Sequence, residues 1–96
     1  MTTKGTTLAS RVRVKEDVVF RDLEGEAVLL NLDSGTYFGL DPVGTRIWAL
    51  LGDHEALTDV HLTLLDEFDV EPDRCERDLL DLVARLDEHG LVEISH

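Results

Sequence analysis

The chain has 96 residues, which suits one domain with a single core but is too short for a catalytic domain and a binding domain together. Hydrophobic residues make up 43% and charged residues 31%, a composition that is typical of a globular protein and excludes a disordered one. The net charge is −12, and from Glu16 onward five basic residues stand against all 21 acidic residues. Such a surface repels nucleic-acid phosphates and anionic membranes, so we expect neither as a partner; it attracts a basic peptide.

The chain shows no signal for export or membrane insertion. No apolar run approaches the roughly 18 residues that cross a bilayer, and the N-terminal residues lack the apolar stretch of a secretory signal. The single cysteine, Cys75, excludes an internal disulfide and fits a reducing compartment. We therefore expect a cytoplasmic protein.

The first half of the chain predicts strands. Residues 1–9 are rich in threonine and predict a flexible arm ahead of a domain over 10–96. β-branched and aromatic residues predict a first strand between 12 and 20, and residues 27–32 predict a second, well-buried strand. Asp33-Ser34-Gly35 is a strong turn signal, and the strand after it covers 36–40.

The length of that turn sets the expected register of the hairpin. A three-residue loop puts six residues on the core face: Val28, Leu30, Leu32, Thr36, Phe38 and Leu40. Leu29, Tyr37 and Gly39 then lie on the opposite face, with Tyr37 at least partly exposed.

The second half predicts three helices. The first begins at Asp41-Pro42, because an Asp carboxylate accepts the free N–H groups of a helix start and proline is tolerated at the first helical position, and it stops near Gly52. The second begins at Thr58, and the third runs from Pro72 to Gly90. Leu80 widens the apolar stripe of the third helix beyond what a core-facing side needs. Residues 91–94 add a short extended segment.

This order of elements predicts an α+β fold, a winged helix-turn-helix in which a three-stranded antiparallel sheet is followed by three helices. The third strand lies at the edge of the sheet, where unpaired N–H and C=O groups can accept another strand.

No catalytic, cofactor or metal constellation is recognisable. His54 and His61 are seven residues apart, without a third ligand at metal-binding spacing, and we interpret them as isolated surface histidines. Cys75 lies on the apolar stripe of the third helix and is interpreted as a packed thiol. The seven glycines form no phosphate loop. We expect no enzyme, no cofactor and no metal.

The winged-helix order admits one alternative, an acidic transcription regulator. As a recognition helix, the third helix would present five acidic residues against only Arg74 and Arg77. Contacts with phosphates need positively charged side chains, so this mainly acidic helix disfavours DNA binding.

Three segments carry a resemblance to a known family: "VLLNLDSGTYFGLD" over 28–41, "DPVGTRIW" over 41–48 and "DLLDLVARLDEHGLVEI" over 78–94. The resemblance covers roughly residues 16–94, nearly the whole domain, and it is to the PqqD-like family of recognition elements for ribosomally made precursor peptides. The chain is most similar to the stand-alone members of lasso-peptide pathways. Asp41 and Val43 stand where the family more often has Asn and Thr or Ser.

The resemblance implies a non-catalytic function. Family members bind the leader of a precursor peptide as an antiparallel strand added to the third strand, with leader side chains in the groove between that strand and the third helix. The residues implied here for the strand are Thr36, Tyr37, Phe38, Gly39 and Leu40. Those implied for the helix are Leu79, Leu80 and Val83 as an apolar wall, with Glu76 and Asp87 placed to hold a Lys or Arg of the leader. For Leu79, core packing is an equal alternative.

The resemblance also implies partners. The leader would be presented to a separate leader peptidase, with a cyclase acting afterwards. The alternative within the family is a peptide chaperone in the biosynthesis of the quinone cofactor PQQ. The open edge strand allows either a monomer or a strand-swapped dimer.

Overall fold

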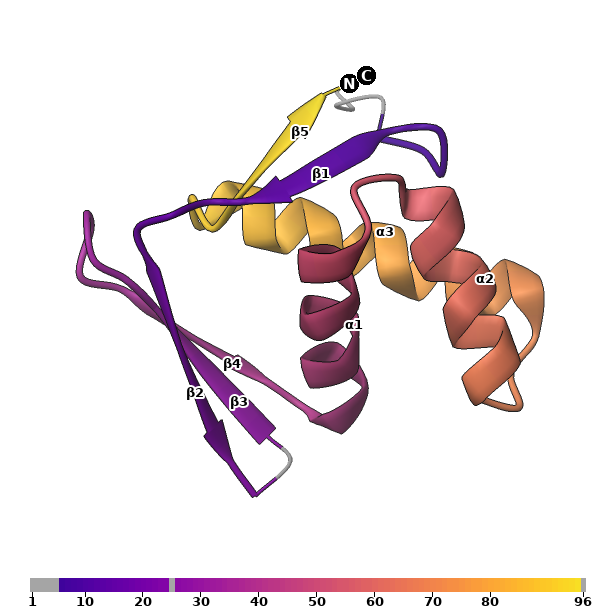
Figure 1. Ribbon diagram of the computed structural model, residues 1–96, viewed down its shortest axis with the longest axis horizontal. Coiled ribbons are helices and arrows are strands. Elements are labelled where there is room, and N and C mark those ends of the chain that lie inside the picture. Colours follow the sequence, from indigo (N-terminus) through magenta and orange to yellow (C-terminus); the bar gives the residue numbers. More distant parts are fainter. Residues whose placement is uncertain (1–5, 25, 96) are drawn as a thin grey trace.

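The computed structural model describes residues 6–24 and 26–95. The elements in chain order are β1 (Arg11–Val14), β2 (Val18–Leu23), β3 (Glu26–Asn31), β4 (Tyr37–Leu40), α1 (Pro42–Asp53), α2 (Leu57–Glu67), α3 (Pro72–Glu88) and β5 (Val92–Ser95). β2, β3 and β4 form the predicted three-stranded antiparallel sheet, which precedes the three helices. α1 stands between this sheet and α2 (Figure 1).

The prediction of one strand between residues 12 and 20 is wrong, because this segment forms two strands in two sheets. β1 pairs antiparallel with β5, bringing Val12 opposite Ile94, whereas β2 pairs with β3. A turn at Glu16-Asp17 separates the two strands. The short extended segment expected at 91–94 is confirmed as β5, and it closes a second, two-stranded sheet close to both ends of the chain (Figure 1).

The register of the β3–β4 hairpin differs from the prediction by one residue. Leu29 lies opposite Phe38 and Leu30 opposite Tyr37. A shift of one residue moves the side chains of β3 to the opposite faces of the sheet. Leu29 is therefore fully buried and Leu30 only partly buried, the reverse of the expectation. Tyr37 is 70% exposed, as expected for the face turned away from the helices.

Asn31 explains the register. Its side-chain oxygen accepts hydrogen bonds from the main-chain N–H groups of Asp33 (2.9 Å) and Ser34 (3.3 Å), so the loop opens one residue earlier than the turn signal indicates. Gly35 closes the loop at a φ of 77°, and its N–H donates to the Asn31 carbonyl at 2.7 Å. Four residues, 32–35, therefore separate the paired Asn31 and Thr36, whose main chains are joined by a hydrogen bond of 2.9 Å.

The helices begin close to where the sequence predicts them. The Asp41 carboxylate caps α1 by accepting from the Gly44 N–H at 2.7 Å. The apolar sides of the three helices pack with Leu29, Leu40 and the β1–β5 pair into one core, in which Trp48 is 8% exposed. The prediction of a surface position for His61 is wrong. Its side chain is buried, and its Nε2 lies 3.1 Å from the Pro72 carbonyl at the start of α3.

The expected arm over 1–9 falls partly on residues 1–5, which lie outside the described residues. Leu8 packs partly buried against the core, and its carbonyl accepts a hydrogen bond of 2.8 Å from the Thr58 hydroxyl at the start of α2. Within the described part of the chain, no helix is both long and apolar enough to span a membrane.

Candidate functional site

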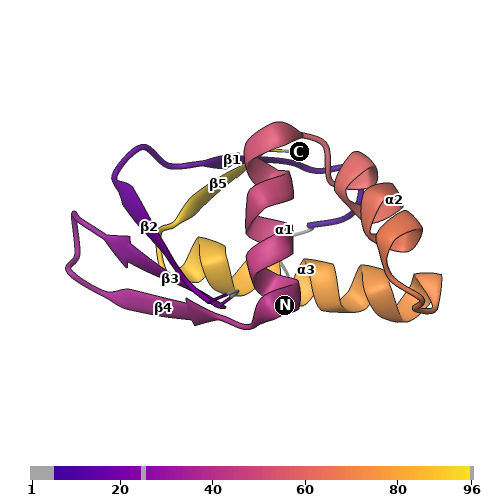
Figure 2. The ribbon, with the colours of Figure 1, turned by 60° about the horizontal axis from the view of Figure 1, so that its bottom comes forward.

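β4 is an edge strand with main-chain groups that are open to another strand. It pairs with β3 on one side, and among residues 6–24 and 26–95 no strand pairs with its other side (Figure 2). Along an antiparallel pair, the residues that bond to the partner alternate with those that point away. Because the Asn31 N–H donates to the Thr36 carbonyl, this alternation directs the N–H and C=O groups of Phe38 and Leu40 toward β3. Those of Tyr37 and Gly39 then point outward.

A groove of about 480 Å³ lies beside this edge. We call it the β4 groove. Its lining comes from three elements: Phe38, Gly39 and Leu40 of β4; Asp41, Val43, Gly44 and Ile47 at the start of α1; and Asp78, Asp81, Leu82 and Arg85 of α3. The groove therefore runs along the strand that can accept a partner, which places side-chain recognition next to main-chain pairing.

Phe38 is the aromatic side chain of the groove, and α3 fixes its position. Its ring meets the His89 ring edge-on at a centroid distance of 4.9 Å, and the His89 Nδ1 lies 2.8 Å from the Arg85 carbonyl. The same end of α3 is bonded to Asn31, whose amide donates to the carbonyls of His89 (3.1 Å) and Gly90 (3.2 Å). The hairpin and α3 are thus joined at one end of the groove.

The charges around the groove are mainly negative. Asp41, Asp78 and Asp81 contribute three carboxylates, against Arg85 as the one cation among the lining residues. The Arg85 Nε lies 3.4 Å from the Asp81 Oδ2, and the Arg74 Nε lies 3.9 Å from the Asp78 Oδ2. A groove of this sign favours a peptide that carries a Lys or Arg.

The structure brings together the expected strand residues but not the expected helix residues. Thr36 directly precedes β4, and Tyr37, Phe38, Gly39 and Leu40 form it. Leu79 and Val83 are 0% exposed and belong to the core, so neither lines the groove. For Leu79 this is the core alternative.

Leu80, Glu76 and Asp87 lie on the other flank of α3. A helix turns about 100° per residue, so Leu80 lies about 160° around the axis from the groove-lining Leu82. Periodicity identifies the buried stripe of a helix, but both flanks of that stripe look alike in sequence. Which flank faces the edge strand depends on how the sheet packs against α1. This packing is tertiary structure, which the periodicity of a helix does not reveal. No sequence pattern therefore distinguishes Asp78, Asp81 or Arg85 as residues that line the groove.

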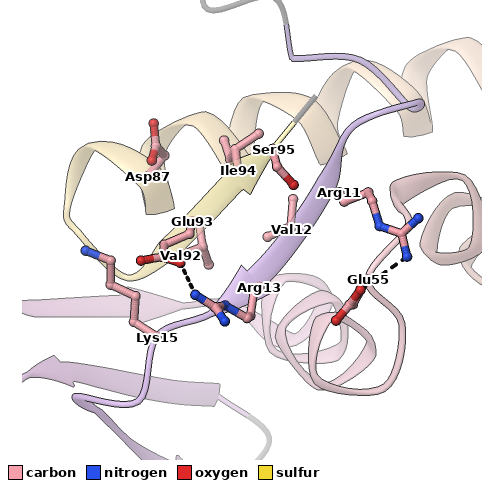
Figure 3. Close-up of a pocket in the computed structure, with 10 residues that line it drawn as sticks. All are labelled: Arg11, Val12, Arg13, Lys15, Glu55, Asp87, Val92, Glu93, Ile94 and Ser95. Carbon is pink, nitrogen blue, oxygen red and sulfur yellow. Dashed lines mark hydrogen bonds and ion pairs between the residues drawn. The ribbon is translucent and has the colours of Figure 1, made fainter.

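Asp87 instead borders a hollow of about 640 Å³ over the β1–β5 sheet. Figure 3 shows two ion pairs there, Arg13 with Glu93 and Arg11 with Glu55. The Arg13 guanidinium lowers the pKa of Glu93, mainly through their hydrogen bond. Because the arginines of this hollow already have carboxylate partners and it lies away from β4, we do not assign it to peptide binding.

The Cys75 thiol lies where ionisation is opposed. Burial, assisted by the nearby Asp78 carboxylate, raises the pKa of the Cys75 thiol, which disfavours a nucleophilic thiolate. Over residues 6–24 and 26–95, no group of three or more His, Cys, Asp or Glu side chains is arranged to hold a metal ion.

A family model described as "Coenzyme PQQ synthesis protein D (PqqD)" matches residues 26–92, the sheet hairpin and all three helices. The chain belongs to the PqqD family. This PqqD-family chain has no match among curated protein sequences.

Two solved structures are similar to this PqqD-family chain over nearly their whole length. One is described as TbiB1 in complex with the TbiA(beta) leader peptide, with a TM-score of 0.79 and 38% sequence identity, covering 84% of this chain and 94% of that one. The other is described as lasso peptide synthetase B1 complexed with the leader peptide, with a TM-score of 0.76 and 30% identity, covering 86% and 98%. Both similar proteins are thus bound to leader peptides.

Proposed function

We propose that this protein binds the leader of a ribosomally made precursor peptide as an antiparallel strand added to β4. The observation that carries the proposal is that both similar structures, at 38% and 30% identity, are complexes with leader peptides. The open edge of β4 supports it, because main-chain bonds to Tyr37 and Gly39 supply affinity without regard to sequence. The β4 groove supplies specificity through alternate side chains of the peptide.

The bound leader is presented to separate enzymes, a leader peptidase and then a cyclase of a lasso-peptide pathway, and the protein itself performs no chemistry. We place this function in the cytoplasm, where the single thiol stays reduced. The site residues we propose are Thr36–Leu40 together with the α1 and α3 residues that line the groove. The net charge of −12 favours a leader with basic residues.

The second candidate is a peptide chaperone of PQQ biosynthesis, which the description of the family model favours. Two labelled probes separate the candidates: the N-terminal half of a lasso-peptide precursor, and a peptide precursor of the quinone cofactor PQQ. Fluorescence anisotropy is expected to show saturable binding of the first probe only. Selective binding of the second would assign the protein to the PQQ pathway.

A matched pair of substitutions tests strand addition itself. Gly39→Pro removes an N–H that points outward and leaves the bonds to β3 in place, a position where an edge strand tolerates proline. Gly39→Ala keeps that N–H, and an added Cβ meets no atom within 4 Å. We expect Gly39→Pro to weaken leader binding by about tenfold, the effect of losing one main-chain bond, while Gly39→Ala binds normally. Equal binding by both would contradict strand addition.

A further inference from the structure

A second, smaller hollow of about 100 Å³ lies among the three helices. We call it the helical pocket. Its walls are mainly hydrocarbon, supplied by Ile47 of α1, Leu64 of α2, Phe68 and Val70 of the α2–α3 connection, and Leu79 of α3. An ion pair borders it, formed by the Arg74 Nε and the Asp78 Oδ2, which lie 3.9 Å apart. An apolar cavity of about 150 Å³ holds a benzene molecule, so a hollow of this size and lining suits a single aliphatic side chain.

The helical pocket opens beside the β4 groove. Val43, Ile47 and Asp78 line both hollows. Two of the exposed large hydrophobic side chains of the protein, Val43 (47%) and Val70 (45%), belong to the pocket. Apolar groups that are left exposed around an apolar hollow are typical of a site that a ligand completes.

The direction of the peptide determines which part of it reaches the helical pocket. This step rests on the proposed function. In an antiparallel addition, the N-terminal side of the bound segment lies at the C-terminal end of β4, at Leu40. The chain continues from Leu40 through Asp41 directly into α1, where Val43 lines the pocket. Residues that precede the added strand therefore leave the sheet over Val43.

We propose that the helical pocket binds one aliphatic side chain of the leader, located within a few residues on the N-terminal side of the segment that pairs with β4. This contact is separate from the strand pairing, and it selects leaders by a hydrophobic residue outside the paired segment. Burial of one such side chain supplies roughly a tenfold gain in affinity.

Cys75 provides a reporter for this proposal. It is the only cysteine of the chain, and it lines the helical pocket. We would measure its alkylation by iodoacetamide by mass spectrometry near pH 9, because burial raises the pKa of the thiol. The probes are the precursor's N-terminal half and a version in which the aliphatic residues ahead of the paired segment are replaced by serine, each at a saturating concentration set by anisotropy.

The full leader is expected to slow alkylation of Cys75 by about fivefold or more, because access controls the rate of a thiol's reaction. The serine-substituted leader is expected to bind more weakly and to leave the rate nearly unchanged at saturation. Equal protection by both peptides, or protection by neither, would overturn the proposal. Saturable binding without protection refutes only this inference, whereas no binding at all refutes the proposed function.

A pocket-filling variant gives a second measurement. Cys75→Leu places extra methyl groups in the helical pocket, whereas Cys75→Ser keeps the size of the side chain. We expect Cys75→Leu to lower the affinity for the full leader by about tenfold and to leave the affinity for the serine-substituted leader unchanged. Cys75→Ser is expected to bind both leaders as the wild type does. If Cys75→Leu binds the full leader as the wild type does, the pocket is only a packing gap. Circular dichroism checks whether Cys75→Leu folds. If this variant does not fold, the alkylation experiment on the wild type decides the proposal.

Discussion

The side-chain amide of Asn31 donates a hydrogen bond of 3.1 Å to the carbonyl oxygen of His89, which joins the β3–β4 hairpin to the end of α3. The same amide donates to the Gly90 carbonyl at 3.2 Å, while its oxygen holds the hairpin loop. Gly90 has a φ of 71°, and a Cβ at this position would lie 3.0 Å from the Asn31 nitrogen. Since Asn31 is 6% exposed, one buried amide sets both the register of the hairpin and its attachment.

The first prediction concerns Asn31 itself. Asn31→Ala leaves carbonyl and N–H groups without partners, and we expect it to lower the free energy of unfolding by about 2–4 kcal/mol. Asn31→Asp keeps the oxygen for the loop but points a carboxylate at two carbonyl oxygens, so we expect an equal or larger loss at pH 7. Urea denaturation measures both, with the exposed Asp33→Asn as control. If Asn31→Asp left the free energy of unfolding unchanged, the hydrogen bonds from the Asn31 amide to α3 would not stabilise the fold.

The second prediction tests the observed register. Leu29 is 0% exposed, whereas Leu30 lies on the outer face and is only partly buried. We expect Leu29→Ala to cost about 2–5 kcal/mol of unfolding free energy and Leu30→Ala about 1 kcal/mol. The two substitutions remove the same atoms, so the difference reports burial alone. The reverse order in thermal or urea denaturation would indicate the register that a three-residue loop produces.

The third prediction identifies the flank of α3 that faces the peptide. Asp78→Lys and Glu76→Lys change the net charge equally, but only Asp78 lines the β4 groove. We expect Asp78→Lys to weaken binding of a basic leader by about fivefold and Glu76→Lys by less than about twofold, because only a nearby charge acts strongly through water. Anisotropy titrations at low salt would show this. A stronger effect of Glu76→Lys would favour the flank of Glu76, Leu80 and Asp87 that the family resemblance implies.

The fourth prediction concerns the ion pair of Arg46 with Glu67, which links α1 to the end of α2 through two hydrogen bonds. Hydrogen bonding to Arg46 lowers the pKa of Glu67 below its ordinary value of 4.5. A lowered carboxyl pKa gives stability that is present above the unfolded-state value and is lost as the pH falls through the folded-state value.

We therefore expect the melting temperature of Arg46→Gln to fall less steeply than that of the wild type as the pH drops from about 5 to 3. Arg77→Gln, on an exposed position of α3, removes the same charge and serves as control. Parallel curves for wild type and Arg46→Gln in thermal scans would show that this pair contributes nothing to acid sensitivity.

Local chemistry made most of the fold predictable. Asp41-Pro42 carries its own capping group, and Pro72 starts α3, so both helix starts follow from single residues. The edge position of β4 follows from the order of the strands. In contrast, the sequence did not reveal the register, because it depends on the Asn31 side chain bonding its own loop, nor the split between β1 and β2, because β1 pairs with the far end of the chain.

The candidate site was only half predictable for a related reason. Tyr37 and Gly39 follow from the edge strand alone, since main-chain groups need no particular side chain. The α3 contribution depends on the rotation of a helix relative to a strand that precedes it by about forty residues. Leu79 and Val83 have the apolar character that fits a binding wall, yet the same character places them in the core.

β4 is only four residues long, which gives an edge of about 14 Å at the usual rise of a strand. A peptide paired along it turns every second side chain toward the groove, so about two of its residues are read there. Recognition of so few side chains requires little of the peptide's sequence. Under the proposed function, most positions of a precursor are then free to diversify while one unchanged binder continues to recognise them all.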